Sequence, residues 1–406
     1  MNKNFVIYIG RFYPPTLLKT LREDSKGKAG GMSNHNFEMS IINGLCQHSD
    51  ITLKCITVPA VYSFPYNNRS LFTKSESYGY KNTYVHSVSF CNLPVIKEIS
   101  LIIVLIAKLI KTFASCEGRR VDVVINTPNY SLLKAIRFAK IFTRKKITQT
   151  VIIPDIPSMV TAMDKQHKIK GLVLKYQNRQ SMKMASESDG LVLLTEAMMD
   201  FVVKPLPYIV MEGIVDIDTM DVEARSLDKE IILYTGTLRK IFGVMNLVQA
   251  FEKVSDKNAE LWICGSGDSE VSIKEASNRN PSIKFFGLVD SQTALQMQRQ
   301  ATILVNPRTS EGEYTKYSFP SKTMEYLLSG KSVIINRLPG IPEEYYQYVF
   351  TPKDESVDAL AECINRVLTL EVNDRVSKAK SGREFVVSQK NSKIQVSRIL
   401  EMINNY

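Results

Sequence analysis

Short apolar runs alternate along the chain with longer stretches in which apolar residues recur three and four positions apart. The short runs, bounded by Gly, Pro, Asn or Asp, are typical of buried strands, whereas the longer stretches indicate helices. This alternation predicts an α/β protein with parallel sheets. Strands are predicted within residues 5–9, 51–58, 84–90, 122–126, 148–153, 190–194, 231–234, 259–264, 283–289, 301–305 and 333–335.

The connecting stretches carry helix signals of different strength. Asp290 is a candidate N-cap, and amphipathic patterns predict helices at 356–370 and 392–403. Residues 99–113 are apolar on nearly every turn. That pattern favours burial between a sheet and its neighbours over an amphipathic helix at a membrane interface.

The chain has 406 residues, a length that favours two domains. Residues 214–228 are acidic and show no apolar period, so we place the boundary there. The first domain is predicted over 1–213, the second over 229–385, and a terminal segment over 386–406.

Composition limits the class of protein. Hydrophobic residues make up 44% and charged residues 23% of the chain, as in ordinary globular proteins. The longest mainly apolar run, residues 99–107, is too short to span a bilayer, and the N-terminus runs into a strand without a signal-peptide layout. A cytoplasmic protein is therefore expected. The six cysteines and four histidines show no metal-ligand spacing, so no metal is predicted.

The net charge of +11 is concentrated in the N-terminal half, where residues 1–204 hold 28 Lys and Arg against 14 Asp and Glu. Nucleic acid and an anionic membrane surface are both partners of basic surfaces. The sequence has no zinc-finger spacing, RNP-like aromatic segment or basic helix followed by heptads. We therefore expect no nucleic acid and favour a peripheral membrane contact. Residues 165–183 are strongly basic and are its candidate helix, although a solvated surface helix is the commoner case.

The most informative stretch is VNPRTSEGEYTKYSFPSKTMEYLLSGKSVI, from Val305 onward. It predicts a strand, a polar loop, a short helix and a second strand, so the loop lies at the carboxyl edge of a sheet, where ligands bind in such folds. Glu325, near the start of that helix, is the leading candidate, although a lone first-turn Glu more often only complements the helix dipole. The other candidates in this stretch are Arg308, Glu313, Tyr317, Ser321 and Lys322.

The segment FPSKTMEYLLSGKSVI resembles the nucleotide-sugar site of retaining glycosyltransferases of the GT-B fold, family 4. The resemblance implies two Rossmann-like domains facing a cleft, with a C-terminal helix that crosses back to the first domain. It also implies that Glu325 holds ribose hydroxyls of the donor nucleotide. Many members carry a partner Glu eight residues earlier, where this chain has Tyr317; Glu311 or Glu313 are the candidates to replace it.

Two basic residues and several glycines extend the predicted donor site. Arg239 and Lys240 follow a predicted strand and could neutralise a departing diphosphate, although surface solvation is the alternative. The glycine-rich loop between the first strand and helix is either a phosphate cradle or a loop tip. The resemblance favours a diphosphate contact there, and a nucleotide pocket at the Gly-x-Gly of Gly265. The glycines assigned to donor binding are Gly30, Gly31, Gly236, Gly265 and Gly267.

Asp155 follows a predicted buried strand and stands between two prolines. A turn residue that caps the next helix and a ligand or base for an acceptor hydroxyl are equally compatible with this position. Many family-4 members have a His in this region, so Asp155 would be a departure from the pattern.

The sequence thus predicts a retaining glycosyltransferase that moves a hexose from a UDP- or GDP-sugar to a lipid-linked saccharide in polysaccharide biosynthesis, with no cofactor. Two alternatives stay open. One is a non-catalytic subunit that binds a sugar nucleotide or polysaccharide, and the other is a GT-B nucleotide-sugar epimerase.

Overall fold

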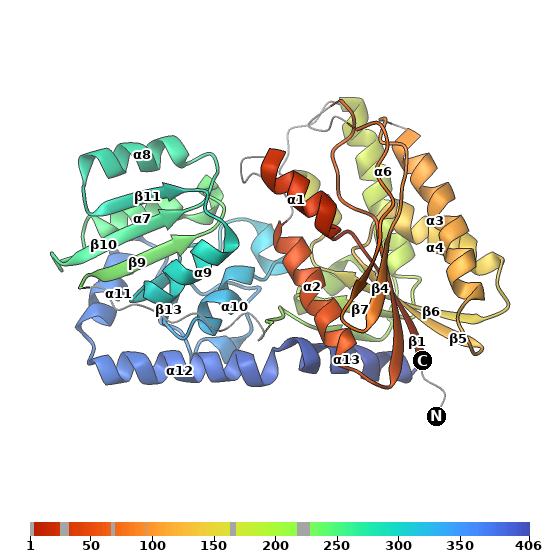
Figure 1. Cartoon of the computed structure of the whole chain (residues 1–406). Helices are drawn as coiled ribbons and strands as arrows, with labels where there is room; N and C mark the ends of the chain where they lie inside the picture. Colours follow the sequence, from red (N-terminus) through yellow and green to blue (C-terminus); the bar gives the residue numbers. More distant parts are fainter. Residues whose placement is uncertain (1–3, 25–31, 66–69, 95, 163–167, 217–227) are drawn as a thin grey trace. The chain divides into compact units, whose positions relative to one another are not determined.

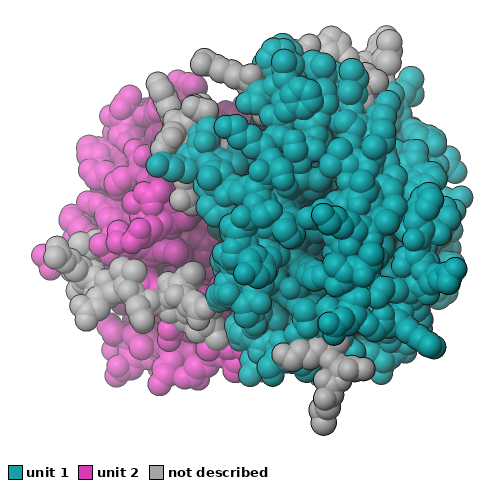
Figure 2. Space-filling model, turned by 45° about the vertical axis from the view of Figure 1, so that its right-hand side comes forward, with its two compact units in different colours: residues 1–24, 29–212, 392–406 teal, residues 25–28, 213–391 magenta. Residues whose placement is uncertain are grey.

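The computed structural model describes residues 4–24, 32–65, 70–94, 96–162, 168–216 and 228–406. These residues form two compact units, which Figure 1 traces along the chain and Figure 2 colours separately. The first unit contains the described residues up to 212 together with 392–406, and the second contains those from 213 to 391. The C-terminal helix therefore returns to the first unit.

The first unit is built on an eight-stranded sheet of order β3-β4-β2-β1-β5-β6-β7-β8. Every neighbouring pair is parallel except β3 with β4. The central strands are almost completely buried, as their uninterrupted apolar runs predict. The strands are β1 (Asn4–Gly10), β2 (Ile51–Thr57), β3 (Ser77–Tyr80), β4 (Thr83–Ser87), β5 (Arg120–Asn126), β6 (Lys146–Ile153), β7 (Gly190–Leu193) and β8 (Tyr208–Val210).

Two groups of helices pack on this sheet. α2 packs against α13, while α3, α4 and α6 lie side by side as a second group (Figure 1). At the first contact Gly44 is required, because a Cβ there would lie 2.3 Å from the carbonyl oxygen of Ser392. The helices are α1 (Pro15–Asp24), α2 (Met32–Cys46), α3 (Ile96–Ala114), α4 (Tyr130–Ile141), α5 (Pro157–Ala162), α6 (Lys168–Ala185), the 3-10 helix η1 (Glu196–Phe201) and α13 (Ser392–Asn404).

The second unit has a five-stranded parallel sheet of order β11-β10-β9-β12-β13. The strands are β9 (Glu230–Thr235), β10 (Ala259–Cys264), β11 (Ile283–Gly287), β12 (Ile303–Asn306) and β13 (Ser332–Ile335). The helical segments are η3 (Lys240–Phe242), α7 (Val244–Phe251), α8 (Glu270–Arg279), α9 (Ser291–Gln300), η4 (Glu313–Tyr317), α10 (Ser321–Leu328), η5 (Glu343–Tyr345), α11 (Val357–Thr369) and α12 (Val372–Gln389).

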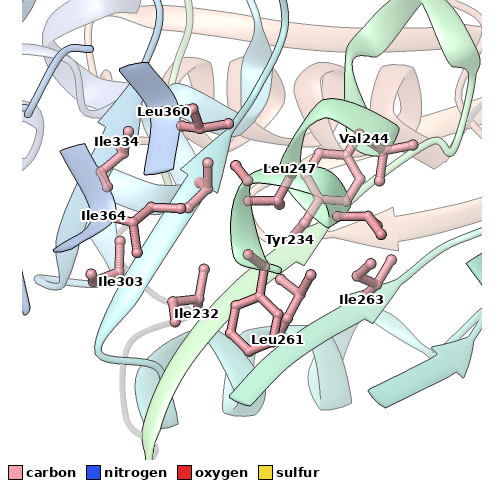
Figure 3. Packing of buried hydrophobic residues seen from close by; sticks show 14 of the residues in the cluster. Ile232, Tyr234, Val244, Leu247, Leu261, Ile263, Ile303, Ile334, Leu360 and Ile364 are labelled. Carbon is pink, nitrogen blue, oxygen red and sulfur yellow. The ribbon is translucent and has the colours of Figure 1, made fainter. Parts of the chain in front are cut away.

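One face of this sheet carries a large apolar core, which Figure 3 shows from close by. Ile232 and Leu261 from the sheet pack there with Leu247 of α7, Ile273 of α8 and Ile364 of α11. From β9 the chain adds β10 and β11 on one side, and then β12 and β13 on the other. The strand order therefore reverses between β9 and β12, and such a reversal places a ligand-binding crevice at the carboxyl ends of the strands.

The predicted α/β fold with two Rossmann-like parallel sheets is confirmed, with local differences such as the following. α1 occupies part of the glycine-rich loop that was predicted between the first strand and helix, and it begins at Pro15, a position that proline favours. α12 was not predicted, since it buries mainly small residues and Phe385 and lacks a broad apolar stripe. The strand predicted at 84–90 is the shorter β4, which pairs with the antiparallel β3.

Candidate functional site

The loops after β9 and β10 pack directly on each other through their glycines. Gly265 has φ +144°, and a Cβ on it would lie 1.7 Å from the carbonyl oxygen of Gly236. A Cβ on Gly267 would lie 2.5 Å from the carbonyl oxygen of Leu238. The backbone N–H of Leu238 donates to the carbonyl of Ser266 over 2.9 Å. Only glycine permits this approach, and we call the two packed loops the glycine floor at the carboxyl edge of the sheet.

The basic pair follows this floor. Arg239 is half-buried, whereas the side chain of Lys240 is exposed. The backbone N–H of Lys240 donates to Oδ1 of Asp268 over 2.7 Å, which ties the β9 loop to the β10 loop. Gly243, with φ +73°, then brings this segment against the β12 loop, because a Cβ there would lie 2.3 Å from the carbonyl oxygen of Pro307.

Arg308, directly after β12 and Pro307, is held in place from several directions. Its guanidinium lies over the ring of Tyr314 at 4.7 Å and near that of Phe242 at 5.5 Å. Both terminal nitrogens donate to Oγ of Ser318 over 3.2 Å. The buried Asn336, just beyond β13, donates to the carbonyl of Arg308 over 3.0 Å. Arg308 is therefore a pre-positioned cation at the carboxyl edge of the sheet.

Glu325 lies one turn into α10 and is fixed at both of its carboxylate oxygens. Lys322 donates to Oε2 over 2.7 Å, and the side-chain amide of Gln298 donates to Oε1 over 2.6 Å. The Glu325 side chain remains 31% exposed. Burial raises the pKa of this carboxyl, but the adjacent Lys322 ammonium and the two hydrogen bonds outweigh burial and hold the pKa below its ordinary value.

A second layer of contacts connects this carboxylate to the sheet. Gln298, which is completely buried, also donates to Oγ1 of Thr235 over 3.1 Å. The hydroxyl of Tyr326 accepts from the backbone N–H of Thr235 and donates to its carbonyl, over 2.9 and 3.1 Å. Because Thr235 is the last residue of β9, these bonds fix the positions of α9 and α10 relative to that strand. They orient Glu325 at the point where the strand order reverses.

The remaining predicted residues of the second unit lie nearby in sequence but differ in exposure. Ser321 is the exposed first residue of α10, and Glu313 is exposed at the start of η4. Tyr317, at the position where the resemblance expects a partner carboxylate, is buried, and the ammonium of Lys316 lies 5.2 Å from its ring centre.

The predicted residues of the first unit fall in two places. Asp155 is exposed just beyond β6 and two residues before α5. Gly30 and Gly31 lie outside the described residues. Within the part of the chain that the structure describes, no three His, Cys, Asp or Glu side chains gather as a metal site.

The first unit also contains a buried carboxylate that sequence reasoning missed. Glu38 on α2 accepts from the backbone N–H of Arg11 at both oxygens, over 3.0 and 2.9 Å. Asn34 donates to it over 2.7 Å and the hydroxyl of Tyr8 over 3.2 Å. Burial raises the pKa of Glu38 to about 7, although the Arg11 bonds and neighbouring donors oppose the rise. Glu38 thereby fixes the loop that follows β1 near Gly10.

Of the two residues that sequence reasoning missed, Glu38 and Gln298, only Glu38 has a signal in the sequence. Glu38 shares its helical phase with the buried Ile41, Ile42 and Leu45, and a carboxylate at such a position indicates a buried partner. Gln298 offers no comparable signal, because its role depends on strands distant in the sequence.

Residues 229–370, which hold the site described above in the second unit, match a family model described as "Glycosyl transferases group 1". The protein is a glycosyltransferase. None of the curated proteins compared with this glycosyltransferase matches it. Solved structures with a similar fold include three proteins of nearly the same length.

The first is HepE of Anabaena in complex with UDP and glucose, with 14% identity, coverage of 99% of this chain and 100% of that chain, and a TM-score of 0.64. The sucrose-phosphate synthase of Thermosynechococcus elongatus has 14% identity, the same coverages and a TM-score of 0.61. The lipopolysaccharide outer core galactosyltransferase WaaB has 13% identity, coverage of 99% of each chain and a TM-score of 0.62. The glycosyltransferase described here therefore has the GT-B fold.

Proposed function

We propose that the protein moves a hexose, with retention of anomeric configuration, from a nucleoside diphosphate sugar to a hydroxyl of a lipid-linked saccharide. The observation that carries this proposal is the fixed carboxylate of Glu325. Its two oxygens are oriented by Lys322 and Gln298, and its lowered pKa keeps it ionised near neutral pH. An ionised, oriented carboxylate accepts hydrogen bonds from a pair of vicinal hydroxyls such as those of ribose.

The charge that develops in this reaction is on the leaving group. As the bond between the anomeric carbon and the diphosphate oxygen breaks, negative charge grows on the diphosphate, and the acceptor oxygen forms the new bond to the same carbon. Arg308 supplies a pre-positioned guanidinium, and Arg239 and Lys240 supply two further cations at the same edge of the sheet. Cations fixed before the reaction stabilise such a transition state without reorganisation.

In this proposal the acceptor binds to the first unit. Asp155 is exposed at the carboxyl end of β6 and is the proposed base or ligand for the acceptor hydroxyl, whose proton must leave as the new bond forms. The names of solved structures with a similar fold support a nucleotide-sugar donor and a saccharide acceptor. WaaB is a lipopolysaccharide outer core galactosyltransferase, and HepE is seen with UDP and glucose. We assign the protein to surface polysaccharide synthesis on the cytoplasmic side of a membrane.

Release of nucleoside diphosphate from a panel of UDP- and GDP-sugars tests this proposal. The wild-type protein should turn over at least one donor, and Glu325→Gln should lower kcat/KM by about a hundredfold. Glu362→Gln is a matched control, because Glu362 also pairs with a lysine, Lys353, but on the exposed surface of α11. Donor binding without turnover in the wild type would instead favour a non-catalytic binding subunit. Interconversion of donor sugars without acceptor would favour an epimerase.

A further inference from the structure

The helices α3, α4 and α6 present apolar side chains to solvent as well as to the sheet. α3 buries Leu101, Leu105 and Leu109 against the unit, yet Ile99 and Ile103 are 57% and 61% exposed on another side of the helix. A helix on the surface of a globular domain normally carries polar residues there. The sequence pattern alone favoured burial of this helix on all sides, whereas the structure leaves one apolar stripe uncovered.

The neighbouring helices repeat this feature. A hydrogen bond joins Glu98 of α3 to Ser131 of α4, and the rings of Tyr130 and Tyr176 join α4 to α6 at 6.4 Å. These contacts place the three helices in parallel as one layer (Figure 1). We call its solvent side the outer face, and its exposed apolar residues include Ile99, Ile103, Phe138, Ile141, Leu172 and Tyr176.

The same layer holds nearly all of the excess positive charge. α4 and α6 contain eight Lys and Arg residues and no Asp or Glu, and α3 adds three Lys and one Glu. The three helices therefore carry a net charge of +10 in a chain whose total is +11. Several of these cations, among them Arg179 and Lys183, are exposed.

We propose that the outer face docks on an anionic lipid bilayer, with its apolar side chains inserted among the headgroups and its cations paired with lipid phosphates. Exposed aliphatic and aromatic residues surrounded by Lys and Arg are the composition of interfacial membrane helices. A nucleic-acid surface would use the cations but not the isoleucine stripe. None of the described helices has the length and apolar composition needed to cross a bilayer. The purpose of this docking rests on the proposed lipid-linked acceptor.

Vesicle sedimentation with the full chain tests the outer face. Wild-type protein should bind vesicles of phosphatidylcholine mixed with phosphatidylglycerol, more weakly as salt is raised, and should not bind phosphatidylcholine alone. The variant Ile99→Asn/Ile103→Asn should lose about tenfold or more in vesicle affinity. The variant Arg179→Gln/Lys183→Gln should lose a similar factor on anionic vesicles.

The chain offers a closely matched control on α12. Val372 and Val376 share the four-residue spacing of the isoleucine pair and are 61% and 57% exposed, but they lie in the second unit. Val372→Asn/Val376→Asn should bind vesicles like the wild type. Three results would each overturn the proposal: equal losses of vesicle affinity in the isoleucine and valine variants, equal binding of the wild type to neutral and anionic vesicles, or no vesicle binding by the wild type. An oligomer that the isoleucine variant dissociates, without vesicle binding, would overturn it in favour of a second copy of the chain.

Donor turnover separates this inference from the proposed function. The isoleucine variant should release nucleoside diphosphate from a donor with a water-soluble acceptor at the wild-type rate, and Glu325→Gln should still bind vesicles. If vesicle binding is absent while turnover persists, only the proposed docking of the outer face is refuted. Turnover that is absent while vesicle binding persists refutes only the proposed transfer.

Discussion

The side-chain amide of Gln298 lies 2.6 Å from Oε1 of Glu325, and the same amide nitrogen lies 3.1 Å from the hydroxyl of Thr235. Gln298 thus links the candidate ribose-binding carboxylate to the last residue of β9. Its position explains how the side chain of a residue on a short helix is held in one orientation, as the proposed ribose contact requires.

Replacing Gln298 by Leu should therefore weaken donor recognition. The substitution removes the hydrogen bond to Oε1 of Glu325, so the carboxylate keeps its bond to Lys322 but loses its link to β9. The KM for the sugar nucleotide should therefore rise about tenfold, with a smaller change in kcat. Initial-rate kinetics measure this split. Gln347→Leu is the control, because Gln347 is exposed and its side chain donates to the backbone carbonyl of Glu344, away from Glu325 in the sequence. Equal kinetic changes in the two variants would contradict the role given to Gln298.

The Lys322 ammonium should control the charge of Glu325. In Lys322→Met the burial effect is no longer outweighed, so the pKa of Glu325 should rise. Donor affinity should then fall as the pH is lowered from about 8 to about 5, whereas wild-type affinity should stay nearly constant over that range. Calorimetric titration at several pH values measures both profiles. Parallel profiles would show that Lys322 does not set the protonation of Glu325.

The wild-type protein should show the matching stability effect. Since the folded pKa of Glu325 is depressed, its contribution to the free energy of unfolding is present above the ordinary carboxyl pKa and is lost as pH falls through the folded value. In Glu325→Gln, the decrease in the free energy of unfolding on acidification should therefore be smaller than in the wild type, as chemical denaturation at several pH values would measure.

Glu38 should give stability a pH dependence of the opposite sign to that of Glu325. Its pKa is raised to about 7, so the folded state binds its proton more tightly than the unfolded state does. Its stabilising contribution is complete below the ordinary carboxyl pKa and is lost as pH rises through about 7. The free energy of unfolding of the wild type should fall by about 3 kcal/mol as pH rises from the ordinary carboxyl pKa to about 7. Glu38→Gln should remove the slope; an unchanged slope in that variant would assign it to another group.

Substitutions at the glycine floor should separate steric clash from backbone strain. Gly265→Ala places a Cβ 1.7 Å from the carbonyl oxygen of Gly236, so it should cost about 3 kcal/mol or more in the free energy of unfolding. Gly287→Ala, with φ +67° and no atom within 4 Å of the added Cβ, should cost about 1 kcal/mol. Chemical denaturation measures both, and equal costs would contradict the close packing of the two loops.

The sequence predicts the parts of this fold that depend on local patterns. The buried strands at the centres of both sheets are visible as apolar runs, and Arg239 and Arg308 are predictable as polar residues that follow two of them. Glu325 is predictable as a charged residue near the start of the helix after the β12 loop. Parallel strands bring such residues to one edge, so the location of the site in the second unit follows from the strand order. The resemblance of the segment around Glu325 adds the expected chemistry.

Other features depend on tertiary contacts that no local pattern encodes. Gln298 and Tyr326 become positioning residues only because α9 and α10 meet β9. The periodicity of α3 could not show which of its apolar sides stays uncovered, because residues on nearly every turn are apolar. Asp155 and the predicted donor residues around Glu325 lie in different units, and no local pattern connects residues so distant in the sequence.

Calorimetric comparison of a nucleoside diphosphate with its 2′,3′-dideoxy analogue, on wild-type protein and on Glu325→Gln, tests the central claim most directly. The base is the one found in the donor panel, and Glu362→Gln serves as the surface control. The wild type and the control should bind the ribonucleotide at least about tenfold more tightly than the dideoxy analogue. Glu325→Gln should lose most of that preference. A preference that survives in Glu325→Gln would contradict the assignment of this carboxylate to the ribose of the donor.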